Sequence, residues 1–139
     1  MKNLLILACC LLINSIQGQD PSIGIFSTSA DIGNPKNGGS SVYNSTDQSY
    51  TTKGSGYNIW FERDEFHYLY NKIKGDFILT ANFKFVGKGV ELHRKTGWML
   101  RSTTDDKSPH ISAVLHGDGL TLLQWRDYKG ASMKDPEDQ

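Results

Sequence analysis

Apolar and polar residues alternate along the chain, most clearly between positions 77 and 85. Every odd position of this segment is apolar, and Thr80, Asn82 and Lys84 stand between the apolar residues. A period of two sends successive side chains to opposite faces of a strand. The pattern therefore predicts a half-buried β-strand over residues 77–85.

Seven shorter runs show weaker strand patterns, and turn residues such as Gly54-Ser55-Gly56 separate most of them. No window of twelve or more residues keeps the 3.6-residue apolar period of a helix. Many short strands at this spacing predict one all-β domain, an antiparallel sandwich or a barrel. The expected strands are 41–44, 49–53, 57–61, 66–73, 97–103, 110–116 and 120–128.

The last two of these strands form a predicted hairpin around Asp118-Gly119, a pair that can take the positive φ values of a type I′ turn. A two-residue loop at this pair places Leu115 opposite Leu122 and Ile111 opposite Arg126. In this register neither face of the hairpin is wholly apolar. One face is therefore expected to hold polar groups toward solvent, a cleft or another element.

The first eighteen residues form a separate segment. Lys2 precedes an apolar run over 4–13, which is shorter than the roughly 20 residues of a membrane-spanning helix. This predicts a signal peptide over 1–18, cleaved near Gly18, and a mature domain over 19–139 that is periplasmic or secreted. The alternative is a lipoprotein modified at Cys9. No further apolar run could hold the mature chain in a membrane.

Removal of the leader excludes several classes of protein. Both cysteines, Cys9 and Cys10, lie in the leader, so the mature chain has neither a disulfide framework nor a cysteine-ligated zinc site. The 15 basic and 15 acidic residues of the whole chain balance, and no Lys/Arg cluster supplies a phosphate-binding surface. We therefore expect no nucleic-acid partner.

Catalytic groups are sparse in the sequence. The Glu-x-Asp-x-Glu pattern that would place the paired carboxylates of a glycosidase on one strand face is absent. The acidic cluster of Glu62, Asp64 and Glu65 fits a solvated turn better than an active site. There is no Gly-x-Ser-x-Gly elbow, although a Ser/His/Asp triad can also be assembled in space from distant residues. The sequence therefore favours a domain without catalysis.

Metal sites receive little support. The four histidines are scattered, without the close spacing of a metal site. Asp31, Asn34 and Asp118 are candidate oxygen ligands for calcium, because they lie in Gly-rich segments where backbone carbonyls can turn inward. Such segments are more often plain turns, and no other cofactor is expected.

A binding surface of aromatic rings and fixed polar groups remains. Such a surface suits a sugar ring, which has an apolar face and a rim of hydroxyls. The alternative is that the tryptophans belong to the core and the polar groups to an exposed sheet face. The predicted ligand-binding residues are Trp60, His67, Trp98, Arg101, His116, Gln124, Trp125 and Arg126.

Several motifs together resemble a bacterial envelope family, often labelled as TolB- or TolR-type biopolymer-transport proteins. Its members carry an N-terminal concanavalin-A-like, laminin-G-like β-sandwich domain of unassigned function, usually followed by a TolB-like β-propeller. The motifs are Asp31-Ile32-Gly33-Asn34, the segment from Gly54 to Phe61, Phe66-His67-Tyr68, Lys74-Gly75-Asp76-Phe77, His93-Arg94-Lys95 and the segment from His116 to Arg126.

The resemblance implies an antiparallel two-sheet sandwich of the jelly-roll type in the envelope, with carbohydrate recognition as the commonest role of the superfamily. The family domain continues for several strands beyond Gln139, so we expect a sandwich that is incomplete at its C-terminus. We expect an exported, non-catalytic domain that binds carbohydrate or a cell-wall polymer. The alternative is a protein–protein scaffold module of a Tol-associated envelope protein, and a glycoside hydrolase is the third hypothesis.

Overall fold

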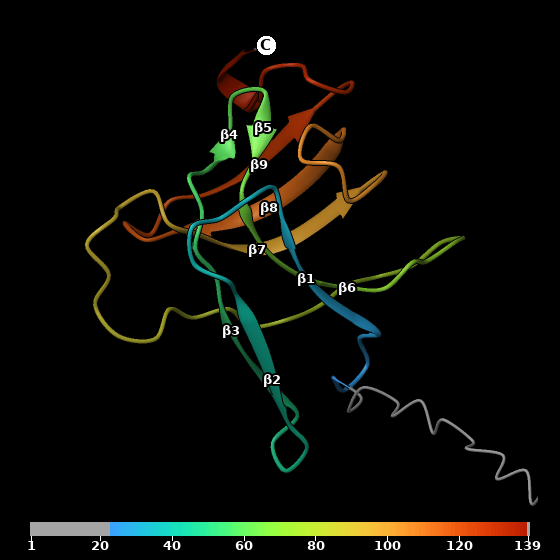
Figure 1. The fold of residues 1–139 in the computed structure, drawn as a ribbon, viewed down its shortest axis with the longest axis vertical. Coiled ribbons are helices and arrows are strands. Elements are labelled where there is room, and N and C mark those ends of the chain that lie inside the picture. Colours follow the sequence, from blue (N-terminus) through green and yellow to red (C-terminus); the bar gives the residue numbers. More distant parts are fainter. Residues whose placement is uncertain (1–22, 139) are drawn as a thin grey trace, which may run out of the picture.

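The computed structural model describes residues 23–138, so the predicted leader, its cleavage site and Cys9 lie outside the described residues. This part of the chain forms nine strands and one short 3-10 helix, with no α-helix (Figure 1). The strands are β1 (Thr28–Ile32), β2 (Ser40–Asn44), β3 (Ser49–Lys53), β4 (Ile59–Trp60), β5 (Arg63–Asp64), β6 (Phe66–Tyr70), β7 (Lys95–Arg101), β8 (His110–His116) and β9 (Thr121–Arg126), followed by the helix Pro136–Asp138.

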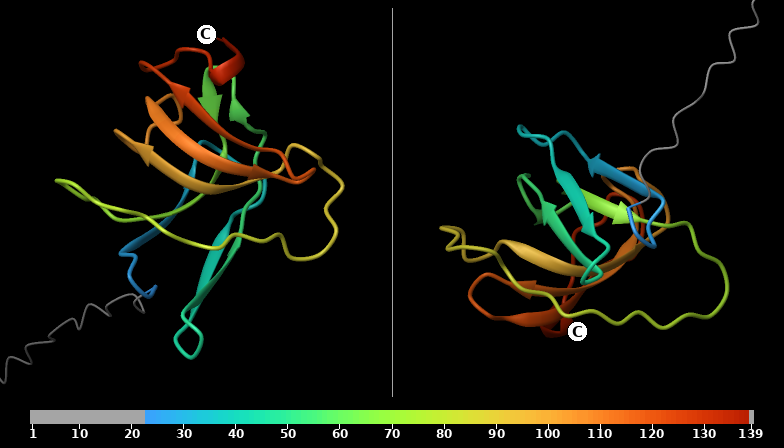
Figure 2. Two further views of the ribbon diagram at one scale, coloured as in Figure 1. Left: turned by 180° about the vertical axis from the view of Figure 1, so that it is seen from behind. Right: turned by 90° about the horizontal axis from the view of Figure 1, so that it is seen from below.

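All of the strand pairs are antiparallel, and the strands form four small sheets. Three of the sheets are two-stranded, β1–β6, β2–β3 and β4–β5, and the fourth is the three-stranded sheet β7–β8–β9. Figure 2 shows the three-stranded sheet as one layer, with β1, β2, β3 and β6 on one side of it. The predicted all-β, antiparallel class is therefore confirmed, in the form of several small sheets. None of the described helices is long and apolar enough to cross a membrane.

The strongest strand prediction, 77–85, is wrong. The segment runs without sheet hydrogen bonds and leaves Phe77 and Leu79 exposed. Phe83 packs edge-on against Trp98 of β7 at a centroid distance of 5.7 Å, and Arg94 covers the ring of Phe85. The alternation of apolar and polar residues indicates only that the backbone is extended. A β-strand also needs a neighbouring strand whose backbone groups can hydrogen-bond to it, and this segment has none.

The other strand predictions are closer to the structure. The expected strands 49–53 and 110–116 coincide with β3 and β8, and most of the others differ from the observed strands by a few residues at their ends. The expected strand 57–61 shrinks to the two residues of β4, while β1 and β5 were not predicted.

The predicted register of the β8–β9 hairpin is wrong by one residue. The backbone N–H of His116 donates to Leu120 O across the loop, at an N–O distance of 2.8 Å. The loop therefore consists of three residues, Gly117-Asp118-Gly119. Leu115 consequently lies opposite Thr121, and Ser112 lies opposite Gln124. Three-residue hairpin loops place a left-handed residue last, and Gly119 has a φ of 96°.

This one-residue difference moves every side chain of β9 to the other face relative to β8. The inner face of the three-stranded sheet carries polar side chains, chiefly Arg101, His110, Ser112, His116, Gln124 and Arg126. The outer face carries Trp98, Leu100, Ile111, Ala113, Leu115, Leu123 and Trp125. Leu100, Ile111 and Leu123 are each about 40% exposed, at 39%, 41% and 43%. The sheet therefore buries its polar side.

The observed loop makes a prediction about glycine. Gly119→Ala places a β-carbon in the left-handed region, which costs about 1 kcal/mol, and lowers the free energy of unfolding measured in urea by about that amount. Gly38→Ala is the matched control, because its β-carbon would make only an ordinary 3.6 Å contact with Asp31 Oδ2. Equal stability of the two variants would contradict the three-residue loop.

Candidate functional site

A buried carboxylate lies at the centre of the inner face. Asp64 of β5 is 0% exposed, and its two oxygens accept hydrogen bonds from the guanidinium of Arg126 of β9. The distances are 2.8 Å from Nη2 to Oδ1 and 2.9 Å from Nη1 to Oδ2. This two-pronged geometry is the strongest form of charge-assisted hydrogen bonding between side chains.

Every nitrogen-bound hydrogen of Arg126 has an acceptor. Besides Asp64, the Nε group donates to Ala131 O at 2.8 Å, Nη1 to Ser108 O at 3.2 Å and Nη2 to Phe61 O at 3.1 Å. Arg126 is only 2% exposed, and a buried guanidinium without partners would be very costly. One side chain thus joins β9 to the β4–β5 hairpin, to the turn before β8 and to the C-terminal segment.

Arg101 and His110 complete this cluster, which we call the Asp64 cluster. Arg101 Nη1 lies 3.3 Å from Asp64 Oδ2, and Arg101 Nη2 donates to Asp105 O at 2.5 Å. His110 Nδ1 lies 3.2 Å from Ser108 O and 3.5 Å from Asp64 Oδ2. Burial lowers the pKa of His110, and the neighbouring Arg101 and Arg126 act in the same direction against the attraction of Asp64. A neutral His110 that donates from Nδ1 to Ser108 O satisfies this geometry.

The Asp64 cluster fixes the β4–β5 hairpin to the sheet. Removing one member of a buried ion pair leaves the other charge uncompensated, at a cost of about 3–5 kcal/mol. The backbone adds two further links, from Asp64 N to Asp106 O at 2.8 Å and from Met133 N to Phe61 O at 3.1 Å. Hydrogen bonds therefore hold the hairpin both at Asp64 of β5 and at Phe61 in its turn.

The turn of this hairpin is strained. Phe61 and Glu62 form a two-residue loop between Trp60 and Arg63, and Phe61 has a φ of 55°. Glycine is usual at the first position of such a loop. A bulky residue in the left-handed region costs about 1–3 kcal/mol and persists only where the surroundings hold it in place. Here the bonds from Arg126 and Met133 to Phe61 O hold it.

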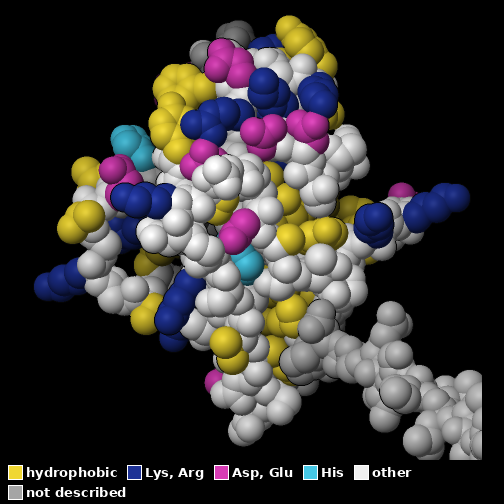
Figure 3. All heavy atoms as spheres, in the orientation of Figure 1, with side chains coloured by type: hydrophobic (Ala, Val, Ile, Leu, Met, Phe, Trp, Pro, Cys, Tyr) yellow, Lys and Arg dark blue, Asp and Glu magenta, His cyan; other side chains and the backbone are white. Residues whose placement is uncertain are grey.

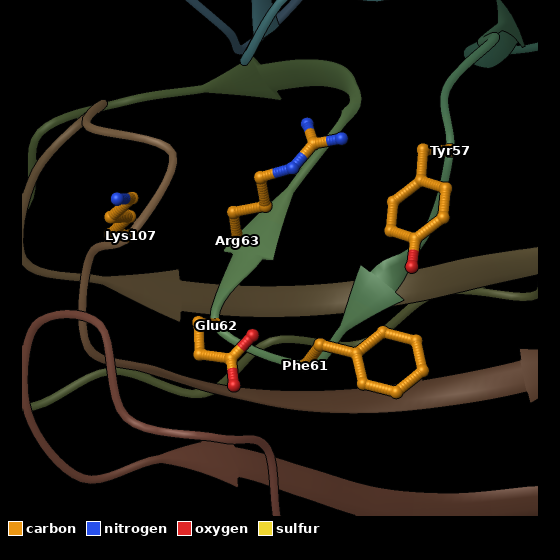
Figure 4. A pocket seen from close by; sticks show the side chains of 5 residues that line it. All are labelled: Tyr57, Phe61, Glu62, Arg63 and Lys107. Carbon is orange, nitrogen blue, oxygen red and sulfur yellow. The ribbon is translucent and has the colours of Figure 1, made fainter.

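The strained turn displays aromatic rings beside a hollow. Tyr57 and Phe61 stack at a centroid distance of 6.2 Å with 25° between their planes, and they are 56% and 48% exposed. They line a hollow of about 410 Å³ together with Glu62, Arg63 and Lys107. Figure 4 shows Arg63 between the rings and Lys107. Figure 3 shows apolar side chains next to basic and acidic ones over β4 and β5. We call these five residues the aromatic site.

Polar contacts with neighbouring residues hold the aromatic site in place. The guanidinium of Arg63 lies 5.0 Å from the centroid of the Tyr57 ring and pairs with the carboxylate of Glu65. The hydrogen bond from Arg63 lowers the pKa of Glu65, which also accepts from Tyr57 N at 3.1 Å. Glu65 N in turn donates to Asn58 O at 2.8 Å. Tyr57 is thus fixed through its backbone, while its ring stays open to solvent.

Four of the predicted ligand-binding residues share the inner face but are buried. Arg101 and Arg126 belong to the Asp64 cluster, and the side chain of Arg101 is 2% exposed. Gln124 and His116 are 3% and 4% exposed, and Gln124 Oε1 and both ring nitrogens of His116 lack a hydrogen-bond partner in the described part of the protein. These four side chains therefore lie in the interior and do not form an open binding surface.

The other four predicted residues lie elsewhere. Trp98 and Trp125 are half-buried on the outer face, whereas Arg101 and Arg126 lie on the inner face of the same sheet. Trp60 is half-buried on β4, next to the strained turn. His67 lies on β6 and bonds to Asp31 and Ser29 of β1. The eight residues therefore do not meet on one face.

The calcium candidates lie in two different parts of the fold. Asp31 belongs to β1 and accepts from His67 and from Gly39 N, while Asp118 caps Leu120 N in the β8–β9 loop at 3.0 Å. Asn34 lies exposed after β1. Among residues 23–138 no group of three or more His, Cys, Asp or Glu side chains is placed to hold a metal ion.

Sequence reasoning missed Asp64 and the aromatic site. The expected solvated turn is present only in part: Glu62 lies exposed in the turn, but Asp64 is the most deeply buried acid among the described residues. The alternation of Ile59 and Phe61 suggested one continuous strand over 57–61, which hid the turn at Phe61. A signal was present in two large aromatic residues, Tyr57 and Phe61, only four positions apart in the sequence.

Comparisons with protein-family models, with curated proteins and with solved structures found no match.

The buried histidines predict a pH dependence of stability. Burial lowers the pKa of both His110 and His116 in the folded state, whereas in the unfolded chain they titrate near 6.5. The unfolded state therefore binds more protons below about pH 6.5, and the free energy of unfolding falls as the pH decreases from 7 to 5. Urea unfolding of the double variant His110→Gln, His116→Gln should show a weaker decline. A decline as steep as in the parent protein would contradict this.

Proposed function

We propose that the protein is a carbohydrate-binding domain that holds its ligand at the aromatic site. The observation that carries the proposal is the pair of exposed, stacked rings of Tyr57 and Phe61 beside a hollow of about 410 Å³. Rings of this size are usually buried, and a hollow with a few convergent polar groups is the ordinary form of a small-molecule site.

The chemistry of the aromatic site fits a sugar. The apolar face of a pyranose ring can stack on Tyr57 or Phe61, and its hydroxyls can bond to Glu62, Arg63 and Lys107 around the same hollow. The backbone links of Tyr57 and Phe61 fix the rings in advance, which reduces the ordering cost of binding. Because only one side of a sugar is covered, we expect affinities in the millimolar to micromolar range, roughly −4 to −8 kcal/mol.

The proposal includes the wider setting that the sequence predicts. The leader favours export to the periplasm or the outside, where a cell-wall polymer or another glycan is the natural ligand. A concanavalin-A-like sandwich and membership of the TolB-associated envelope family are part of the same hypothesis. The antiparallel all-β architecture supports it at the level of fold class.

A protein–protein scaffold module is the second candidate function. The observation that favours it is the outer face of the three-stranded sheet, where Leu100, Ile111 and Leu123 remain exposed beside half-buried tryptophans. Contiguous apolar surface of this kind often marks an interaction site. This face and the aromatic site use different residues, so substitutions separate the two functions.

The test is a glycan-array screen at high protein concentration, followed by titration of the best ligand with the parent protein and Tyr57→Ala. A sugar that covers about 50 Å² of the ring gains roughly 1.3 kcal/mol at 25 cal/mol per Å², so the variant should bind about tenfold more weakly. Tyr128→Ala is the matched control, because Tyr128 is also exposed but lies outside the aromatic site.

Binding that is lost in Tyr57→Ala and kept in Tyr128→Ala supports the carbohydrate site. A folded parent protein that binds no glycan contradicts the proposal and leaves the outer face as the better candidate. Equal affinity of the two variants contradicts the assignment to the aromatic site.

A further inference from the structure

Three side chains on the β1–β6 ladder form a linked set. Ser29 and Asp31 are two residues apart on β1, so they share a face, and His67 of β6 lies directly opposite Asp31. His67 Nε2 lies 2.8 Å from Ser29 Oγ, and His67 Nδ1 lies 2.8 Å from Asp31 Oδ1. A serine, the two nitrogens of a histidine and a carboxylate thus follow one another in a single chain of hydrogen bonds.

The direction of these bonds follows from the chemistry of the groups. The ionised carboxylate of Asp31 can only accept, so His67 donates from Nδ1. Nε2 of the neutral ring then carries the lone pair and accepts the hydroxyl hydrogen of Ser29. The hydrogen bond from His67 and the backbone bond from Gly39 both lower the pKa of Asp31, which keeps the carboxylate ionised. This is the polarity that activates a serine nucleophile.

The surroundings hold His67 and leave Ser29 and Asp31 near the surface. The His67 side chain is 4% exposed, and a β-carbon on Gly39 would lie 2.3 Å from its ring, so the glycine backbone packs directly on the imidazole. Gly39 N also donates to both oxygens of Asp31, at 3.1 Å and 3.0 Å. Asp31 remains 29% exposed and Ser29 is only partly buried, so the set lies at the surface.

We propose that Ser29, His67 and Asp31 hydrolyse carboxylic esters. Ser29 Oγ attacks the carbonyl carbon as its proton passes to His67 Nε2. The bond to the alcohol oxygen then breaks, and the alcohol leaves with that proton. Water next attacks the acyl group on Ser29, gives a proton to His67 and releases the carboxylic acid, while the serine regains its hydrogen. Ser29 and His67 are the catalytic residues, and Asp31 is a positioning residue.

This activity goes beyond carbohydrate binding and does not depend on it. None of the three residues lines the hollow of the aromatic site. A purely structural role, in which the hydrogen bonds only join β1 to β6, would stabilise the ladder without raising the reactivity of Ser29. Reactivity and stability therefore distinguish the two roles.

The experiment is labelling of the purified protein with a fluorophosphonate, followed by peptide mass spectrometry, together with hydrolysis of p-nitrophenyl acetate. We expect an adduct on Ser29 and ester hydrolysis, both abolished in Ser29→Ala. His67→Gln should slow both by about a hundredfold or more, the usual contribution of a general base. Ser41→Ala is the matched control, because within the described residues Ser41 Oγ bonds to another hydroxyl, that of Thr52, at 3.2 Å, and to no histidine. This variant should react like the parent.

Circular dichroism and thermal unfolding establish that each variant is folded. A folded parent protein that forms no adduct on Ser29 overturns the proposal, whatever the variants do. Labelling of Ser29 no faster than that of Ser41, or labelling and hydrolysis that are unchanged in folded His67→Gln, also overturns it.

Discussion

The ion pair between Asp64 and Arg126 holds the β4–β5 hairpin, the turn before β8 and the C-terminal segment against the three-stranded sheet. A carboxylate and a guanidinium that are both withdrawn from water need almost complete hydrogen bonding. The partners of Arg126 come from three segments: the β4–β5 hairpin, the turn before β8 and the C-terminal segment. Only Ile32, Val114 and Met133 are buried apolar residues in the described part of the chain, whereas seven polar or charged residues are buried there. Hydrogen bonds and ion pairs between buried polar groups therefore organise the interior more than the burial of apolar side chains does.

The ion pair also connects the interior to the surface. Arg126 contacts Asp64 and the carbonyl of Phe61 with the same nitrogen, so the group that neutralises the buried charge also holds the strained turn. The turn presents Phe61 next to Tyr57, and Arg63 joins Tyr57 to the remainder of the hairpin. The exposed rings are therefore fixed by the interior, which is the physical reason that a short hairpin can serve as a rigid binding surface.

The sequence predicted the class of the fold and many of its strands but not the arrangement of the sites. β3 and β8 were predicted at their observed ends, because alternation and turn residues agree there. The segment 77–85 failed because the pattern reports an extended backbone and says nothing about a hydrogen-bonding partner. The loop that ends at Gly119 has three residues and not two, so β9 lies one residue away from its predicted register. Gln124, and not Trp125, therefore lies opposite Ser112. Asp64 and Arg126, like Asp31 and His67, are distant in the sequence, so only the fold brings them together.

A double-mutant cycle tests the central role of this ion pair most directly. Urea unfolding of the parent, Asp64→Asn, Arg126→Gln and the double variant gives the coupling energy between the two side chains. We expect a coupling of about 2 kcal/mol or more, because each single variant leaves a buried group without its partner. The same cycle on the exposed pair Asp105 and Lys129 should show little coupling. Additive effects of Asp64→Asn and Arg126→Gln, within about 0.5 kcal/mol, would contradict the account.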